Sequence, residues 1–111
     1  MNSPSRRGEG ENSPEITCLH LVLRASADVL AECLACVGEN DSVALVDAAV
    51  GLPGRPDFAA RLQGRVKVYC LEADLLARGL GVLAGTAGLE TIDDQGLIQL
   101  ICQHDHCLSW K

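Results

Sequence analysis

Residues 16–38 read ITCLHLVLRASADVLAECLACVG, and this stretch decides the fold of the chain. The first eight residues are an apolar run mixed with β-branched side chains, too short to cross a bilayer, which indicates a buried strand. A turn at residues 24–26 follows, and apolar side chains then recur at helical spacing. The expected inward face of this helix is made by Val29, Leu30, Cys33, Leu34 and Val37. A strand, a turn and a helix in this order predict the first unit of a parallel α/β fold.

The predicted helix has clear signals at both ends and carries two thiols. Ser26 is a good N-cap, Asp28 suits the positive end of the helix dipole, and Gly38 is a natural stop. Cys33 and Cys36 lie inside the helix. These two cysteines are the best chemical lead in the sequence.

The rest of the chain alternates between strand and helix signals. We expect strands at 42–47, 65–71 and 89–92 and a loop at 48–56. Short helices are expected at 58–63 and 72–78, and a last helix at 95–104 with Leu97, Ile98 and Ile101 inward. Residues 107–110 are expected to form an edge strand or a packed tail. This alternation predicts an α/β fold: a single three-layer domain over 16–111, with a short, mostly parallel sheet of four to five strands flanked by helices. In such sheets functional groups gather at the carboxyl ends of the strands. Residues 1–15 are rich in Ser, Pro, Gly, Asn and charge, which predicts a disordered arm.

Composition narrows the classes of function. The chain has 111 residues, 48% of them hydrophobic, and a formal charge of −6 with a pI of about 4.8. Acidity and scattered basic residues argue against direct binding of nucleic acid or an anionic membrane. The six cysteines lie in apolar periodic segments rather than in a loop-rich scaffold, and no signal peptide is visible. We therefore expect a cytoplasmic protein with reduced thiols.

Several motifs resemble one known family. Residues 66–79 read VKVYCLEADLLARG and resemble the DsrH/TusB family, where a K-x-Y strand leads into D-L-x-A-R-G. Leu19-His20 resembles the family's opening, and Ile92-Asp93 with Trp110 resembles its end. The similarity extends over residues 16–110. Asp47-Ala48 departs from the Asp-Gly common in the family, and the N-terminal arm is an addition.

The resemblance implies a fold and a function. The fold is the DsrEFH-like, Rossmann-like α/β domain. The function is that of a small subunit in a heterohexameric sulfur relay, with sister DsrE/DsrF-like (TusD/TusC-like) subunits and a downstream acceptor protein. One branch of the family serves sulfur oxidation and the other serves 2-thiolation of the tRNA wobble uridine. The DsrH branch carries a cysteine in an L-x-x-C-L pattern, and Cys33 in Leu30–Leu34 matches it. The match favours the oxidation branch, with Cys33 as the persulfide carrier and no cofactor; a TusB-like or purely structural subunit is the alternative.

Each thiol also has a plainer interpretation. Cys33 is equally explained as a small hydrophobe on the sheet-facing stripe, since free cysteine is often buried. Cys36 completes a C-x-x-C, but that motif is activated where it opens a helix, and here both thiols lie in the interior. Cys36 is therefore the weaker candidate.

The C-terminal segment CQHDHC, residues 102–107, offers metal-ligating side chains. Cys102 and His106 could share a helical face with a spacing that suits zinc. The alternative is that His104 and His106 are solvated at the negative end of a helix, and with an incomplete ligand set we assign no metal. Residues 80–89 and Trp110 are interpreted as contact surface for a partner, and Asp47 as a loop cap.

Overall fold

The computed structural model describes residues 16–62, 66–86 and 88–111. Its strands are β1 (Cys18–Val22), β2 (Ser42–Leu45), β3 (Lys67–Leu71), β4 (Leu89–Ile92) and β5 (His106–Trp110), and its helices are α1 (Ala27–Cys36), α2 (Phe58–Leu62), α3 (Glu72–Ala77) and α4 (Asp94–Gln103), with 3₁₀ turns η1 (Asp47–Gly54) and η2 (Gly81–Gly85). The five strands form one sheet in the order β4-β3-β2-β1-β5, with every pair parallel. The predicted α/β fold is confirmed.

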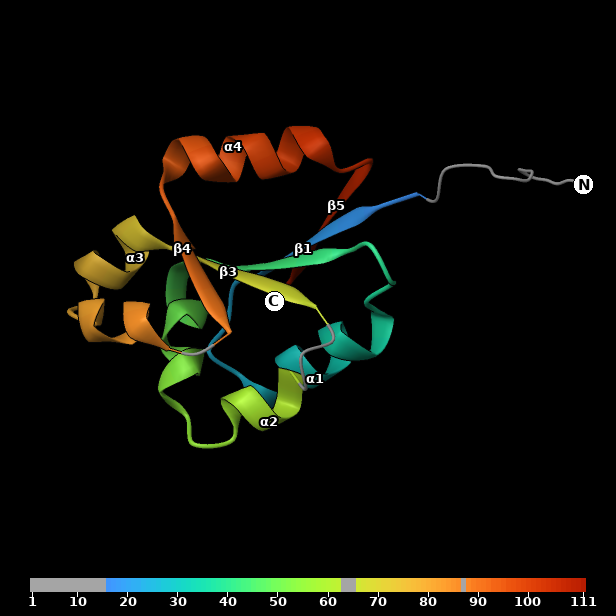
Figure 1. Ribbon diagram of the computed structural model, residues 1–111. Coiled ribbons are helices and arrows are strands. Elements are labelled where there is room, and N and C mark those ends of the chain that lie inside the picture. Colours follow the sequence, from blue (N-terminus) through green and yellow to red (C-terminus); the bar gives the residue numbers. More distant parts are fainter. Residues whose placement is uncertain (1–15, 63–65, 87) are drawn as a thin grey trace, which may run out of the picture.

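The strand order explains which helix covers which face. From β1 to β4 the chain steps in one direction across the sheet, whereas β5 returns past β1 to the opposite edge. Because parallel crossovers are right-handed, the returning connection must cross the other face. Accordingly α1 and α2 lie on one side of the sheet and α4 lies on the other (Figure 1).

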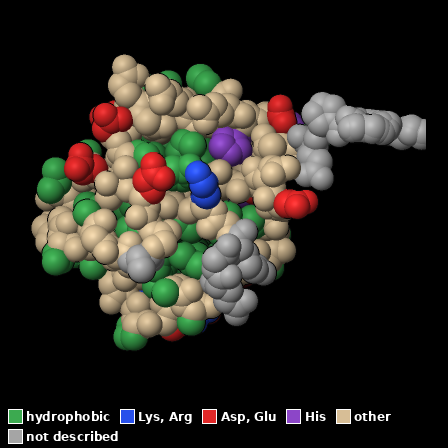
Figure 2. Space-filling model, viewed as in Figure 1, with side chains coloured by type: hydrophobic (Ala, Val, Ile, Leu, Met, Phe, Trp, Pro, Cys, Tyr) green, Lys and Arg blue, Asp and Glu red, His purple; other side chains and the backbone are tan. Residues whose placement is uncertain are grey.

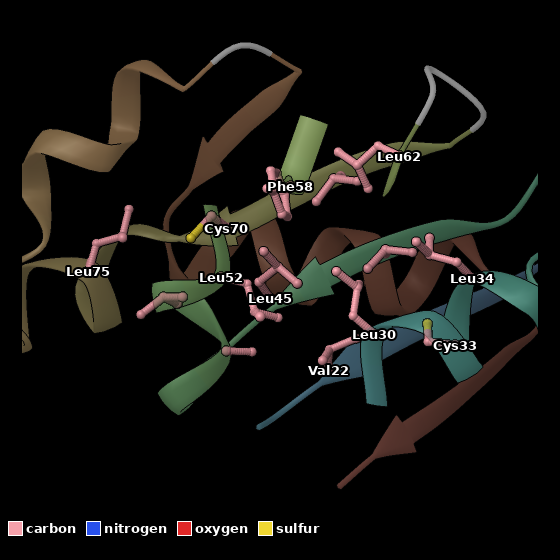
Figure 3. Packing of buried hydrophobic residues seen from close by; sticks show 14 residues of the cluster. Val22, Leu30, Cys33, Leu34, Leu45, Leu52, Phe58, Leu62, Cys70 and Leu75 are labelled. Atoms are coloured by element: carbon pink, nitrogen blue, oxygen red, sulfur yellow. The ribbon is translucent and has the colours of Figure 1, made fainter. Parts of the chain in front are cut away.

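The main core lies between the sheet and the first face. It is built from side chains of β1, β2 and β3 together with those of α1, η1, α2 and α3 (Figure 3). All four residues of β2 are buried, as expected for the central strand of a sheet covered on both faces. Of the predicted inward face of α1, Leu30, Cys33 and Leu34 are buried, and Val29 and Val37 pack half-buried against them.

The second face is more thinly covered. Its buried cluster consists of Leu19, Ala44 and Leu100. The predicted inward face of α4 is wrong in part, because Ile98 and Ile101 are 56% and 42% exposed. The stripe facing the sheet is instead Leu97, Leu100 and His104, at helical spacings of three and four and rotated away from the predicted one.

Local differences from the predicted elements have clear physical reasons. The segment predicted as a loop at 48–56 is largely the 3₁₀ turn η1, because Ala49, Val50 and Leu52 bury their side chains in the main core. The predicted helix α4 begins one residue early because Asp93 is its N-cap, accepting the Gly96 N–H at 2.7 Å. The predicted arm at 1–15 lies outside the described residues, as do the predicted helix end at Gln63 and strand start at Arg65.

On the face shown in Figure 2, red carboxylate side chains are scattered over the surface and outnumber the blue basic ones. Among the described residues, none of the helices has the length and apolar character needed to cross a bilayer.

Candidate functional site

Helix α1 brings the two candidate thiols to the amino-terminal end of the sheet. The helix starts at the N-cap Ser26, whose hydroxyl accepts the Val29 N–H at 3.3 Å, and ends at Cys36. It runs antiparallel to β1, so its last turn lies near the start of β1, beside Cys18. The thiols therefore lie at the amino-terminal ends of the strands. The sequence analysis predicted functional groups at the other ends, the carboxyl ends of the strands.

Cys33 points into the core. Its side chain is 0% exposed and belongs to the main hydrophobic cluster (Figure 3). Burial raises the pKa of the Cys33 thiol to about 12, and the neighbouring Cys36, Cys18 and Asp41 add to the shift. Because only the thiolate is a good nucleophile, Cys33 in this conformation is a protonated core thiol.

Cys36 has the opposite environment. It is the last residue of α1, its side chain is exposed, and its sulfur is free, as is that of Cys33. The C-x-x-C motif thus places one thiol in solvent and one in the core behind it. A reactant in solvent can reach Cys36 without any rearrangement of the helix, whereas Cys33 must first be uncovered.

Asp41, in the connection from α1 to β2, organises the backbone around these thiols. One carboxylate oxygen accepts the Cys18 N–H at 2.9 Å, and the other accepts the Gly38 N–H at 2.8 Å and a ring nitrogen of His20 at 2.9 Å. Burial alone would raise the pKa of Asp41, but these donors, led by Gly38, outweigh it and hold the pKa below its usual value. Asp41 is therefore a fixed anion that joins the end of α1 to β1.

His20 continues the network inward. The side chain is 1% exposed, with Nε2 against Asp41 and Nδ1 3.0 Å from the Trp110 indole nitrogen. The indole can only donate, so Nδ1 is the acceptor and Nε2 carries the proton toward Asp41. The two rings also stack, with centroids 6.0 Å apart and an angle of 30° between planes. Both ring nitrogens of this buried histidine thereby have hydrogen-bond partners.

This network was only partly visible in the sequence. Leu19-His20 and Trp110 entered through the family resemblance as separate pieces, and the structure joins them although they are 90 residues apart. Trp110, interpreted as contact surface, has an internal partner. Asp41 was missed, although a histidine inside the apolar run of β1 was a signal that a buried partner had to exist.

The resemblance motif D-L-x-A-R-G forms a brace at the carboxyl edge. Asp74 accepts the Asp47 N–H at 2.6 Å, and the Arg78 guanidinium is 2.5 Å from the Asp47 carboxylate. Asp47 has φ of 53°, an uncommon value for a residue with a side chain, and Gly79 has φ of 70° at the end of α3. Asp47 is therefore more than a loop cap: it is a left-handed turn residue held by α3.

The C-terminal cysteines and histidines do not converge on a metal. Cys102 and His106 do not share a helical face, because α4 ends at Gln103 and His106 is in β5. The ring of His104 makes hydrogen bonds instead: Nδ1 lies 2.7 Å from the Leu100 carbonyl oxygen, and Nε2 lies 3.2 Å from the Ser42 hydroxyl oxygen. Across residues 16–62, 66–86 and 88–111, no three His, Cys, Asp or Glu side chains are placed to hold a metal ion.

Comparison with protein families identifies the family to which the chain is similar. A family model described as "DsrH like protein" matches residues 25–107. The matched region begins at the turn before α1 and ends within β5, so it includes Cys33, Asp41 and the brace. A search of curated proteins found no match.

Proposed function

Because this chain belongs to the DsrH-like family, we propose that it is a subunit of a cytoplasmic sulfur-relay complex linked to intracellular sulfur oxidation. The observation that carries the proposal is the family match over residues 25–107. Its partners would be sister DsrE/DsrF-like subunits and a downstream acceptor protein. Cys33 in the L-x-x-C-L pattern favours this branch over a TusB-like role in tRNA 2-thiolation.

The chemistry proposed for Cys33 is thiol exchange. Its thiolate attacks the terminal sulfur of a donor persulfide R–S–SH, forming Cys33–S–SH and releasing the donor thiolate R–S⁻. In the conformation described, burial and a pKa of about 12 oppose this step. Transfer to Cys33 therefore requires the last turn of α1 to open, or contact with a sister subunit to uncover the thiol. Cys36, exposed three residues later, is the second candidate.

A structural subunit without its own sulfur transfer is the alternative. The specific observation in its favour is the same burial of Cys33, which is what a small core hydrophobe would show. The two functions differ in one measurable property, namely whether a cysteine of this chain gains sulfur.

The experiment is intact mass spectrometry after exposure to polysulfide, on wild type, Cys33→Ser and Cys36→Ser. Cys102→Ser is the matched control, because Cys102 is exposed on the distant helix α4. A reductant-reversible gain of about one sulfur mass, lost in Cys33→Ser but kept in Cys102→Ser, supports Cys33 as carrier. Loss in Cys36→Ser alone moves the carrier to Cys36. No gain in any of the four proteins favours the structural subunit.

A further inference from the structure

Helix α1 holds one thiol in solvent and a second thiol in the core beside it. Both sulfurs are free; Cys36 is the exposed last residue of the helix, and Cys33, three residues earlier, is 0% exposed. Side chains three residues apart on a helix are neighbours, with Cβ atoms about 5–6 Å apart. A sulfur atom carried by Cys36 therefore lies next to an enclosed thiol of the same helix.

A persulfide on Cys36 is long enough to meet the Cys33 thiol. Its terminal sulfur lies one S–S bond, about 2 Å, beyond Sγ, and each Sγ lies one further bond from its own Cβ. Rotation of the two side chains and a slight loosening of the turn are enough to bring the terminal sulfur against Cys33 Sγ. A bulky donor, in contrast, cannot reach Cys33 unless the core is opened.

The last turn of α1 is the part of the helix that loosens most easily. At the amino end, the Leu30 N–H donates to the Ser26 carbonyl at 3.0 Å, whereas at the carboxyl end the Val37 N–H donates to the Leu34 carbonyl at 3.4 Å. The C-cap Val37 is extended, so the helix does not end in the left-handed glycine cap that fixes many helix termini. Helix ends fray more readily than helix interiors. The turn that carries Cys36 can therefore move while the rest of the helix stays packed.

Cys18 is a second thiol near Cys33, and it is a poorer entry point. Besides burial, both Cys36 and Cys18 raise the pKa of Cys33, as expected for neighbouring groups. Cys18 is only partly exposed, and burial, followed by Asp41 and Cys107, raises the pKa of its thiol. Of the two thiols beside Cys33, Cys36 is the one that a reactant in solvent can reach.

We infer that Cys36 is the entry thiol, and Cys33 the enclosed acceptor, of a two-step sulfur relay within α1. The inference rests on the proposed function and adds the path of the sulfur. In the first step the Cys36 thiolate attacks the terminal sulfur of a donor R–S–SH, so that Cys36–S–SH forms and R–S⁻ leaves. In the second step the Cys33 sulfur attacks that terminal sulfur while the Cys33 proton passes to the leaving Cys36 thiolate. The products are Cys33–S–SH and Cys36–SH, and the exchange needs no oxidant or reductant.

The relay answers the two obstacles to direct uptake by Cys33. Burial keeps donors in solution away from this thiol, and a pKa of about 12 leaves little thiolate. Sulfur held on Cys36 makes the transfer intramolecular, and well-oriented intramolecular reactions reach effective concentrations of about 10⁵ M or more, which offsets the scarcity of thiolate. Once on Cys33, the sulfur is enclosed and shielded from reactants in solvent.

The test follows sulfur uptake from polysulfide by intact mass, in a background with the two remaining exposed cysteines, Cys102 and Cys107, changed to Ser. In this background the added sulfur is expected to appear quickly and then to become resistant to cyanide, which removes accessible sulfane sulfur as thiocyanate. Cys33→Ser should gain sulfur equally fast but keep it sensitive to cyanide. Cys33→Ala repeats this measurement without a hydroxyl in the core. Cys36→Ser should gain sulfur at a rate about tenfold lower, because the intramolecular step is lost.

Cys18→Ser is the matched control, because it removes the other neighbouring thiol and keeps the backbone N–H that donates to Asp41. It should behave like the background. Equal uptake by Cys36→Ser means that sulfur reaches Cys33 directly, which overturns the relay and leaves the proposed function standing. Sulfur that stays sensitive to cyanide in the background, or uptake that is slowed by Cys18→Ser, also overturns the relay. No uptake in any variant overturns the proposed sulfur transfer and the relay with it.

Discussion

Replacing Asp41 with Asn is expected to destabilise the protein strongly, and the size follows from its contacts. An asparagine keeps one carbonyl oxygen, which can still accept the Cys18 N–H. The other oxygen becomes an NH₂ group facing two donors, the Gly38 N–H and the proton on His20 Nε2, which lie 2.8 and 2.9 Å from it in wild type. A hydrogen bond to a charged group contributes about 1.5–3 kcal/mol, and this full amount applies to the buried His20 donor. Gly38 is exposed, so its N–H can bond water instead and adds less. We expect a loss of about 2–3 kcal/mol in the free energy of unfolding.

The pH dependence of that loss is a sharper test. The pKa of Asp41 lies below its usual value of 3.8 in the folded protein, so the stabilisation by its charge is complete above that pH. It is lost as the pH falls through the lower folded value. The difference between wild type and Asp41→Asn should therefore be constant near neutrality and shrink in acid below about pH 4.

The assay is urea unfolding, followed by far-UV circular dichroism and by fluorescence of Trp110, the single tryptophan. Glu39→Gln is the matched control, because Glu39 is an exposed carboxylate two residues away, where substitutions usually change stability by less than about 0.5 kcal/mol. If Asp41→Asn is no less stable than Glu39→Gln at pH 7, the hydrogen bonds of Asp41 do not stabilise the fold. A difference that persists unchanged in acid would refute the role of the charge.

Three further results are expected. Trp110→Phe leaves the buried His20 Nδ1 without a donor and should cost about 1–3 kcal/mol, measured by urea unfolding with circular dichroism; an unchanged midpoint would contradict the network. Asp47→Gly should leave the stability of the fold nearly unchanged, because relief of the left-handed backbone strain offsets the loss of the exposed ion pair. Asp47→Val should lower the stability by about 1–2 kcal/mol in the same assay. If the valine variant is the more stable of the two, the backbone at Asp47 is not strained. Alkylation by iodoacetamide, followed by peptide mass mapping, should modify Cys36 rapidly and Cys33 only on unfolding, and comparable rates would show that α1 opens readily.

The sequence predicted the elements well where each carried its own boundary signals. Helix α1 follows from Ser26 and the apolar spacing after it, and β4 was predicted at the residues where it forms, 89–92. The errors arose where tertiary contacts decide. On α4, Leu97 was correctly predicted to face inward, whereas Ile98 and Ile101 are exposed. The buried residue is Leu100 instead, because these side chains are similarly apolar and only the position of the sheet selects among them. Likewise η1 looked like a loop because of its Gly and Pro, although its apolar side chains are core.

The sequence identified the cysteines of the candidate site, but it did not identify the groups that surround them. Spacing placed Cys33, and not Cys36, on the inward face of the helix, and the structure confirms that Cys33 is buried and Cys36 is exposed. Spacing could not show which groups lie beside the thiols, because those groups come from other parts of the chain. Asp41 had no local motif, since its partners are backbone N–H groups and a histidine 21 residues away. Contacts of this kind are specified by the whole fold.

The position of Asp41 bears directly on how Cys33 could act. Opening the last turn of α1 far enough to expose Cys33 must move the segment after Cys36, and that segment is held by the bond from the Gly38 N–H to Asp41. The same carboxylate opposes ionisation of Cys33. A partner that draws the carboxylate away would therefore do two things at once: it would release the end of the helix and remove a negative charge from beside the thiol. If Cys33 carries sulfur, its burial is the main reason that it is inactive in the conformation described, and the charge of Asp41 adds to this effect. Release of the bond from the Gly38 N–H to Asp41 is then one way to uncover the thiol.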